Sequence, residues 1–272
     1  MIPLPHSTSS VHFYDLNPYG NTYVVGDIHG CYDELMIALK SIGFDFKRDI
    51  LFSLGDIVDR GTDDYLTMSL LQQPWFRMIL GNHEALHLEN YLTHPSNGTY
   101  WAIPYEQTND SNYQQFLTTC RTLPNAIVLD DRYVLIHAAL PLICYSSLAE
   151  VVDVKQTLLE YEFWTSLYRP DPTLWDIHYL NHPSTATLPG IERVFHGHFI
   201  QPTVVIKDKT TYLDTGFMAP NYSRNSVNKL SFVLLDKVND PVYLTVHVDF
   251  VNKKTVDIEV DNVLYTAYHL YN

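Results

Sequence analysis

Three apolar runs of this 272-residue chain each end in a glycine that is followed at once by a carboxylate or an amide. The runs are TYVV before GDIHG, ILFSL before GDIVDRG and WFRMIL before GNHE, starting at Thr22, Ile50 and Trp75. Glycine lets the backbone leave a strand sharply and lets a ligand approach closely. Because α/β sheets bind ligands at the carboxyl ends of their strands, the pattern predicts an α/β fold with a site at those ends.

Amphipathic stretches follow these runs and predict helices between the strands. The expected strands are Thr22–Val25, Ile50–Leu54 and Trp75–Leu80, and the expected helices are Asp33–Ser41, Asp63–Gln72 and His83–Tyr91. Pro74 ends the second of these helices. The alternation of strand and helix favours stacked layers around a largely parallel sheet.

The remaining sequence is expected to extend this arrangement. Residues 93–123 are polar and aromatic and predict a loop and a helix, and Val151–Leu167 predicts a further helix. Ala126–Leu129 and Tyr133–Ile136 flank two aspartates, which is typical of a hairpin. From Arg193 onward β-type runs dominate, among them RVF, TVVI, TYL, SFVLL and VYLTVHV.

These elements together predict an α/β fold, a layered β-sandwich of mixed sheets flanked by helices. No repeat, low-complexity tract or long linker divides the chain. We therefore expect a single domain over 1–272, with a core at about 21–216 and a β-rich C-terminal extension at 217–272.

Charge and cysteine content exclude several classes of protein. The chain has 31 acidic and 17 basic residues, a net charge of −14, so a nucleic-acid partner is not expected. Its longest uncharged stretch, Tyr133–Ala149, is shorter than the ~20 residues of a membrane span, and no signal peptide is visible. Cys31, Cys120 and Cys144 are widely spaced, which indicates a reducing compartment and a cytoplasmic protein.

Six side chains at predicted strand ends form a candidate metal-binding set. They are Asp27, His29, Asp56, Asn82, His137 and His198. Two carboxylates, one amide oxygen and three imidazoles suit Mn, Fe or Zn better than a zinc–thiolate site or a calcium cage. Six ligands exceed the needs of one tetrahedral site, so the set predicts two divalent ions that share a carboxylate.

The five motifs GDIHG, GDIVDRG, GNHE, a lone strand-end histidine and GH resemble the calcineurin-like metallophosphoesterases. GDIVDRG and GNHE are similar to those of the phosphoprotein phosphatase family, especially its compact phage and bacterial members. The resemblance implies a metallophosphoesterase-like fold with two divalent transition-metal ions, most often manganese. It implies that Asp27, His29 and His198 hold the first ion, that Asp56 bridges, and that Asn82 and His137 hold the second.

The resemblance also implies the reaction and the remaining roles. A metal-activated hydroxide would attack phosphorus in line, without a covalent intermediate. Arg60 and Asn82 would bind the phosphoryl oxygens, His83 would protonate the leaving group, and Asp59 would hold the other nitrogen of His83. The expected substrate is a phosphorylated protein, carrying phosphoserine or phosphothreonine, or a small phosphoester.

Three alternatives remain open. A symmetrical dinucleoside-tetraphosphate hydrolase would use the same ligands, although Arg60 and Glu84 favour the protein phosphatase. The stretch from His83 to His87 is a literal H-E-x-x-H, so a zinc protease would depend on His87, whereas in a phosphatase His87→Ala should leave activity almost unchanged. A scaffold without metal would not need all six ligands.

One expected residue is missing from the sequence. The family carries a further phosphate-binding arginine upstream of the final GH, and here the corresponding stretch, 174–178, contains none. Arg169 and Arg193 are the nearest candidates, and neither has a matching context. This departure concerns phosphate affinity and substrate choice more than the type of reaction.

Overall fold

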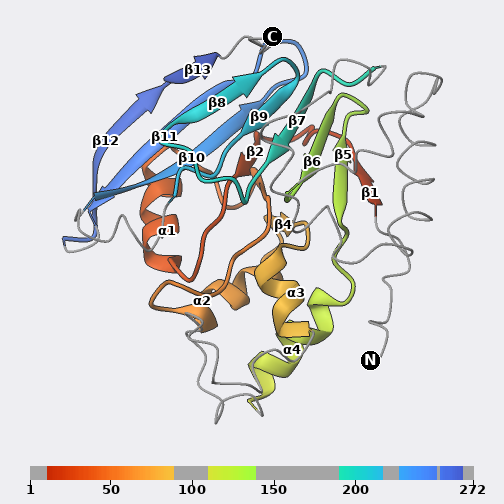
Figure 1. Cartoon of the computed structure of the whole chain (residues 1–272), viewed down its shortest axis with the longest axis vertical. Helices are drawn as coiled ribbons and strands as arrows, with labels where there is room; N and C mark the ends of the chain where they lie inside the picture. Colours follow the sequence, from red (N-terminus) through yellow and green to blue (C-terminus); the bar gives the residue numbers. More distant parts are fainter. Residues whose placement is uncertain (1–10, 89–109, 139–189, 217–226, 250–251, 266–272) are drawn as a thin grey trace, which may run out of the picture.

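Two β-sheets lie face to face at the centre of the protein (Figure 1). The computed structural model describes residues 11–88, 110–138, 190–216, 227–249 and 252–265. The helix predicted at Val151–Leu167, the loop over 93–109 and Arg169 lie outside these residues.

The three motif strands lie side by side in a six-stranded sheet. Its order is β12 (Lys254–Val260), β11 (Val242–Asp249), β10 (Val227–Leu235), β2 (Thr22–Val25), β3 (Ile50–Ser53) and β4 (Phe76–Met78). β2, β3 and β4 are parallel to one another, so their carboxyl ends meet at one edge. β10 pairs antiparallel with β2, so the C-terminal strands continue the sheet that carries the motifs.

The second sheet has seven strands and contributes the two histidine motifs. Its order is β1 (Val11–Tyr14), β5 (Ala126–Leu129), β6 (Tyr133–Ile136), β7 (Arg193–His196), β9 (Thr210–Tyr212), β8 (Val204–Lys207) and β13 (Val263–Tyr265). β5 and β6 form the predicted antiparallel hairpin. β6 and β7 are parallel, so His137 and His198 leave the sheet at the same edge.

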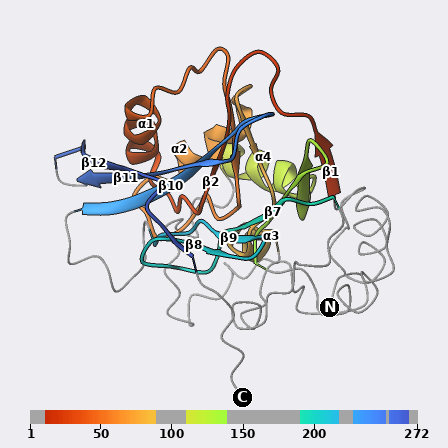
Figure 2. The same cartoon turned by 90° about the horizontal axis from the view of Figure 1, so that it is seen from above.

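Helices cover the outer face of the six-stranded sheet and one end of the sandwich. They are α1 (Tyr32–Ser41), α2 (Asp64–Ser69) with the 3₁₀ turn η1 (Leu70–Gln72), α3 (Asn82–Leu88) and α4 (Ser111–Cys120). Figure 1 shows α2, α3 and α4 gathered at one end of the sheets, and Figure 2 shows the sheets as separate layers. Among the described residues, no helix is both long and apolar enough to cross a bilayer.

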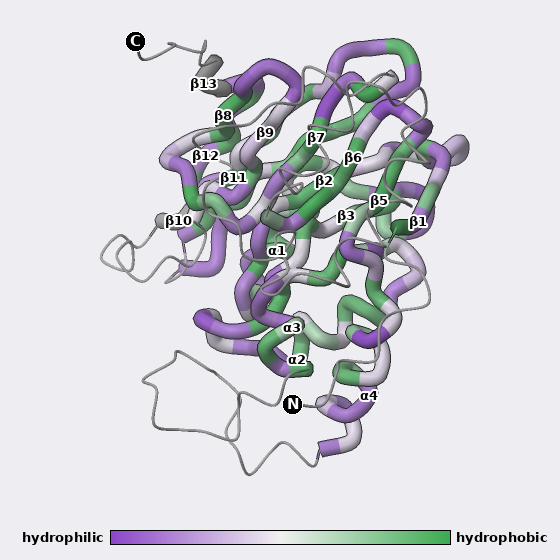
Figure 3. Tube along the Cα trace, turned by 45° about the vertical axis from the view of Figure 1, so that its right-hand side comes forward, coloured by the Kyte–Doolittle hydropathy of each residue, from purple (hydrophilic) through white to green (hydrophobic). Residues whose placement is uncertain are grey.

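Alternation along the strands divides the apolar residues between two cores. Val24 and Phe52 pack against Phe195 of the opposite sheet, whereas Val25 faces α1 and contributes to the core that contains Leu35. β2 is buried on both faces, which accounts for its continuous apolar sequence. Figure 3 shows the hydrophobic residues concentrated along the strands.

The predicted α/β layering is confirmed, with local differences at element ends. The helix predicted from Asp63 to Gln72 is α2 followed by η1. It begins one residue later than predicted, because the Asp63 side chain accepts the N–H of Leu66 and caps α2. β1, β12 and β13 were not predicted. β12 does alternate apolar Val256, Ile258 and Val260 with polar residues, which is the period of a strand, although Val256 and Val260 are exposed.

Candidate metal centre

Backbone hydrogen bonds join the loops that follow β2 and β3. The N–H of His29 donates to the carbonyl of Asp56 at 2.9 Å, and that of Gly30 donates to the carbonyl of Ile57 at 2.8 Å. Asp27 and Asp56 thereby face the same imidazole: Nε2 of His29 lies 3.8 Å from Oδ2 of each. Both carboxylates are buried.

The buried side chain of Glu84 attaches the loop after β4 to the loop after β3. Its carboxylate accepts the backbone N–H groups of Asp56 and Ile57, both at 2.9 Å, and that of Gly81 at 3.0 Å. Burial and the nearby charge of Asp56 raise the pKa of Glu84, and these N–H donors oppose the shift. In GNHE, Glu84 therefore holds the two loops together, in addition to the candidate ligand Asn82.

Several candidate residues hold strained backbone conformations. His29, Asp56, Asp59, Arg60 and His198 all have positive φ, between 48° and 67°. This left-handed region is unfavourable for residues with a Cβ, and such strain clusters where function requires a fixed geometry. The surrounding hydrogen bonds and packing must stabilise these five conformations.

Two motif glycines provide space for the carboxylates. A Cβ at Gly197 would collide with Oδ1 of Asp27, and a Cβ at Gly81 would collide with the backbone nitrogen and Oδ1 of Asp56. The glycines of GNHE and HGH are therefore needed because the acids lie against their backbone.

The first group of candidate ligands contains Asp27, His29 and Asp56. Nδ1 of His29 lies 2.9 Å from the carbonyl of Val58 and donates to it, so the lone pair of Nε2 faces the two acids. Burial lowers the pKa of His29 to about 3, and burial also raises the pKa of Asp27. A neutral imidazole aimed at two buried carboxylates, with its other nitrogen held by a carbonyl, is the usual arrangement of a metal ligand.

The second group contains Asn82, His137, His198 and again Asp56. Nδ1 of His137 donates to the carbonyl of Leu54 at 2.7 Å, which leaves the Nε2 lone pair 2.7 Å from Oδ1 of Asn82 and 3.5 Å from Oδ1 of Asp56. Nδ1 of His198 is 3.0 Å from the same amide oxygen. Acceptors that converge in this way in a buried site fit a cation.

Asp56 belongs to both groups. In the first group, Nε2 of His29 lies 3.8 Å from Oδ2 of Asp56 as well as from Oδ2 of Asp27. In the second, the ligand atoms of Asp56, His137 and His198 lie within 4.8 Å of one another, and His83 lies equally close to His29 and Asp56. The buried carboxylate of Asp56 also accepts the backbone N–H of His83 at 2.9 Å, at the start of α3. The described residues can thus hold divalent metal at two adjacent positions.

The side chain of His198 lies in a different group from the one expected. The resemblance placed it with Asp27 and His29, but only its backbone N–H reaches Asp27, at 3.1 Å from Oδ1. Its ring lies beside the His137 ring, with the centroids 5.0 Å apart. The structure therefore associates the His198 imidazole with Asn82 and His137.

His83, Asp59 and Arg60 lie beside these groups. Nδ1 of His83 is 2.8 Å from Oδ2 of Asp59, and the Arg60 guanidinium lies 2.7 Å from Nε2 of His29 and 3.1 Å from Nε2 of His83. Burial would lower the pKa of His83, but the carboxylates of Asp56 and Asp59 outweigh it and raise that pKa. Because a guanidinium only donates, Nε2 of His83 accepts from Arg60 in this structure, and Nδ1 donates to Asp59; a proton at Nε2 requires Arg60 to turn toward another acceptor.

Two further acids, which the sequence did not single out, support the site. Asp64 accepts the backbone N–H of Asp59 at 2.9 Å. Asp214, in the stretch YLDTG, is buried next to Asp27, and burial raises its pKa to about 6. The stretch Tyr212–Gly216 (YLDTG) resembles the family's segment after its final histidine and was the available signal for Asp214, whereas Asp64 had none.

Arg193 does not contribute to the site. It begins β7, whereas His196 and His198 lie at and beyond the other end of that strand. Its guanidinium donates to the carbonyl of Asp208 at 3.3 Å. Of the described arginines, Arg60 is the one that contacts candidate site residues.

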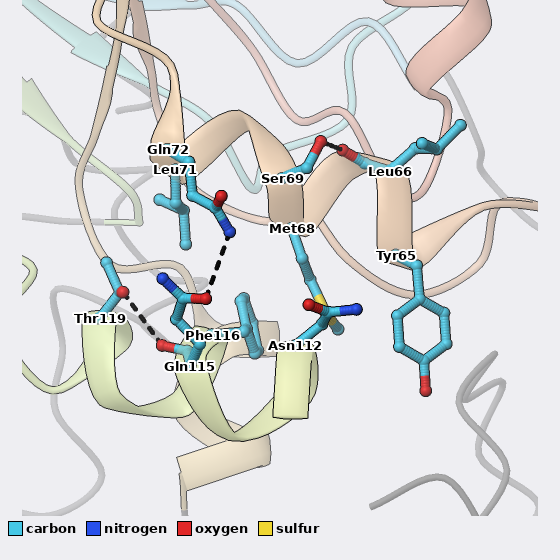
Figure 4. A pocket seen from close by; sticks show the side chains of 10 residues that line it. All are labelled: Tyr65, Leu66, Met68, Ser69, Leu71, Gln72, Asn112, Gln115, Phe116 and Thr119. Carbon is cyan, nitrogen blue, oxygen red and sulfur yellow. Dashed lines mark hydrogen bonds between the residues drawn. The ribbon is translucent and has the colours of Figure 1, made fainter. Parts of the chain in front are cut away.

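A separate cavity of about 300 Å³ lies between α2 and α4 (Figure 4). Tyr65 and Met68 line it from α2, and Asn112 and Phe116 line it from α4. None of its lining side chains is charged, so it offers no partner for a phosphate.

Comparison with known proteins agrees with this geometry. Residues 20–202 match the family described as calcineurin-like phosphoesterase. Serine/threonine-protein phosphatase 2 of Salmonella typhimurium is 31% identical over 224 residues, which span 78% of this chain and 96% of that protein. A symmetrical bis(5′-nucleosyl)-tetraphosphatase of Cellvibrio japonicus is 30% identical over 164 residues, spanning 57% of this chain and 60% of that protein.

A solved structure shares the fold. A protein serine/threonine phosphatase from Saccharomyces cerevisiae superposes with a TM-score of 0.59 at 17% identity, covering 96% of this chain and 85% of that one. Together with the family match and the bacterial relatives, this shows that the chain belongs to the calcineurin-like phosphoesterases, a family of metal-dependent hydrolases.

Proposed function

We propose that this protein is a dinuclear-metal phosphomonoesterase that removes phosphate from phosphoserine or phosphothreonine in proteins. The observation that carries the proposal is Asp56, a buried carboxylate shared by two groups of ligand atoms. Two-metal phosphoesterases hold their ions about 3.5–4 Å apart, which a shared carboxylate makes possible. The Salmonella relative, matched over 96% of its length, supports a protein substrate.

We propose one set of residues for each ion. The first ion would take Asp27, His29 and Asp56, and the second would take Asp56, Asn82, His137 and His198. We propose manganese, and iron or zinc would fit the same oxygen and nitrogen donors. When bound, the ions would activate water and neutralise the charge of the phosphate.

The chain's own residues would orient the phosphate and deliver a proton. The Arg60 fork and the Asn82 amide would bind the phosphoryl oxygens. The oxygen of water adds to phosphorus and the bond from phosphorus to the serine or threonine oxygen breaks. The leaving oxygen takes the Nε2 proton of His83, and the proton that the attacking water releases to solvent is matched by one that returns to His83. Asp59, which accepts from Nδ1 of His83, keeps the ring oriented and favours its protonated form.

A second candidate function uses the same site. The Cellvibrio relative is named as a symmetrical bis(5′-nucleosyl)-tetraphosphatase, so hydrolysis of dinucleoside tetraphosphates is the alternative. The protein phosphatase is favoured because its relative is matched over nearly its whole length and because Glu84 follows GNH.

A side-by-side assay separates the two functions. With added manganese, kcat/KM on a phosphoserine peptide is expected to exceed that on diadenosine tetraphosphate by about 10-fold or more. The reverse ratio would assign the chain to the alternative. Hydrolysis of neither substrate, and none of p-nitrophenyl phosphate, would overturn the proposal.

The cellular setting is part of the same proposal. The thiols of Cys31 and Cys120 are free and buried, which supports a reducing compartment such as the cytoplasm. The net charge of −14 argues against a nucleic-acid partner.

A further inference from the structure

The carboxylate of Asp59 contacts a second imidazole besides that of His83. Nε2 of His87 lies 3.1 Å from Oδ1 and 3.2 Å from Oδ2 of Asp59. His83 and His87 are four residues apart on α3, so they share one face of the helix. Asp59 and His87 are both fully buried, which makes this a contact inside the protein.

Tyr113, from α4, fixes the other side of the His87 ring. Its hydroxyl lies 3.0 Å from Nδ1 of His87, and the two rings meet edge to face with centroids 5.7 Å apart. Burial raises the pKa of Tyr113, so the hydroxyl keeps its proton. The Tyr113 hydroxyl donates a hydrogen bond to Nδ1 of His87, so the ring hydrogen is on Nε2 and points at Asp59. In the opposite tautomer, the Nε2 lone pair would face the Asp59 carboxylate.

These contacts form a continuous chain from Tyr113 through His87 and Asp59 to His83. A buried carboxylate held by one donor can still rotate about its terminal bond, whereas donors on both sides fix its plane. Asp59 needs that support, because its own backbone has a φ of 67° and its side chain is the contact that orients His83.

We propose that His87, held by Tyr113, is a positioning residue that fixes Asp59 and thereby the direction in which His83 delivers its proton. This inference rests on the proposed function, in which His83 is the general acid. It replaces the sequence-based expectation that His87→Ala leaves phosphatase activity almost unchanged. It also explains the H-E-x-x-H stretch without a zinc protease.

The leaving group distinguishes positioning from simple packing. A serine alkoxide must be protonated as it departs, whereas p-nitrophenolate leaves as a stable anion and gains little from a general acid. Loss of a hydrogen bond in this chain should therefore slow hydrolysis of the phosphoserine peptide much more than hydrolysis of p-nitrophenyl phosphate. General loss of structure would slow both substrates equally.

The test compares kcat on these two substrates for His87→Leu, His87→Gln and Tyr113→Phe in the manganese-loaded protein. His87→Leu should lower kcat on the peptide about 10- to 50-fold and on p-nitrophenyl phosphate less than about 3-fold. His87→Gln can still donate to Asp59 and should recover most of the loss. Tyr113→Phe keeps the ring and removes the hydroxyl, and should cost about 2- to 5-fold on the peptide alone.

Two reference variants complete the design. The ring centroids of Phe116 and His87 lie 5.8 Å apart. Phe116→Leu therefore alters the packing against His87 without removing a hydrogen-bonding group, and should change kcat on both substrates by the same factor. His83→Asn shows the leaving-group effect of losing the acid itself. If His83→Asn discriminates between the substrates but His87→Leu and Tyr113→Phe do not, the positioning role is wrong and the proposed function stands. If His87→Leu does not fold, Tyr113→Phe decides by the same criterion.

Discussion

Asp56→Asn is expected to lower kcat on p-nitrophenyl phosphate by about 10³-fold or more and to reduce the metal content of the purified protein. Asn is nearly isosteric and can still accept the N–H of His83, so the change removes charge more than shape. Asp56 is the residue common to both ligand groups, and its loss should weaken both ions. Steady-state kinetics and elemental analysis of the same preparation measure the two effects.

A matched control separates this effect from the loss of any buried acid. Asp49 is also buried, and its carboxylate accepts the backbone N–H groups of Asn21 and Asp45 outside the site. Asp49→Asn should lower the melting temperature and leave metal content and kcat near those of the wild type. If Asp56→Asn retained full metal content and activity, the shared-carboxylate arrangement would be wrong.

His83→Asn is expected to lower kcat on a phosphoserine peptide by about 10²–10⁴-fold while sparing metal content. The Asn amide can occupy the position of Nδ1 and keep the hydrogen bond to Asp59, but it has no proton to give the leaving oxygen. Elemental analysis is decisive here, because His83 also lies close to His29 and Asp56. A variant that had lost its metal would show that His83 is a ligand.

A half-buried histidine outside the site provides the comparison for this variant. His247 lies on β11 and pairs with Glu259, away from the candidate ligands. His247→Asn should change neither turnover nor metal content, so a comparable loss in both variants would count against a specific role for His83.

The three strand-end motifs could be predicted because each has its own local signal. An apolar run followed by glycine and a carboxylate or amide shows both where a strand ends and which side chain leaves it first, and Gly81 does lie where a Cβ would strike Asp56. The parallel pairing of β2, β3 and β4 then brings those ends together.

Contacts between segments that are distant in the sequence could not be predicted from local sequence patterns. The His198 ring meets Asn82 and His137, which come from other strand ends, and no residue pattern reports that contact. β1 pairs in parallel with β5, which lies more than a hundred residues later in the sequence. The sequence of one short strand does not indicate which strand it will pair with.

Contacts between buried polar side chains account for the other features of the site that were not predicted. The hydrogen bonds made by Glu84 and the contact of His87 with Asp59 depend on which buried groups meet inside the fold. The sequence presented His87 as part of the H-E-x-x-H stretch, with the expectation that His87→Ala would leave phosphatase activity almost unchanged. The same spacing of four residues sets both rings of α3 beside one carboxylate.

The central claim, a two-metal hydrolase, is tested most directly by metal analysis of the wild-type protein combined with an assay on p-nitrophenyl phosphate. We expect about two transition-metal ions per chain, loss of hydrolysis after removal of the metal with a chelator, and recovery on addition of manganese. A folded protein that hydrolyses the substrate at the same rate before and after its metal is removed would contradict the account.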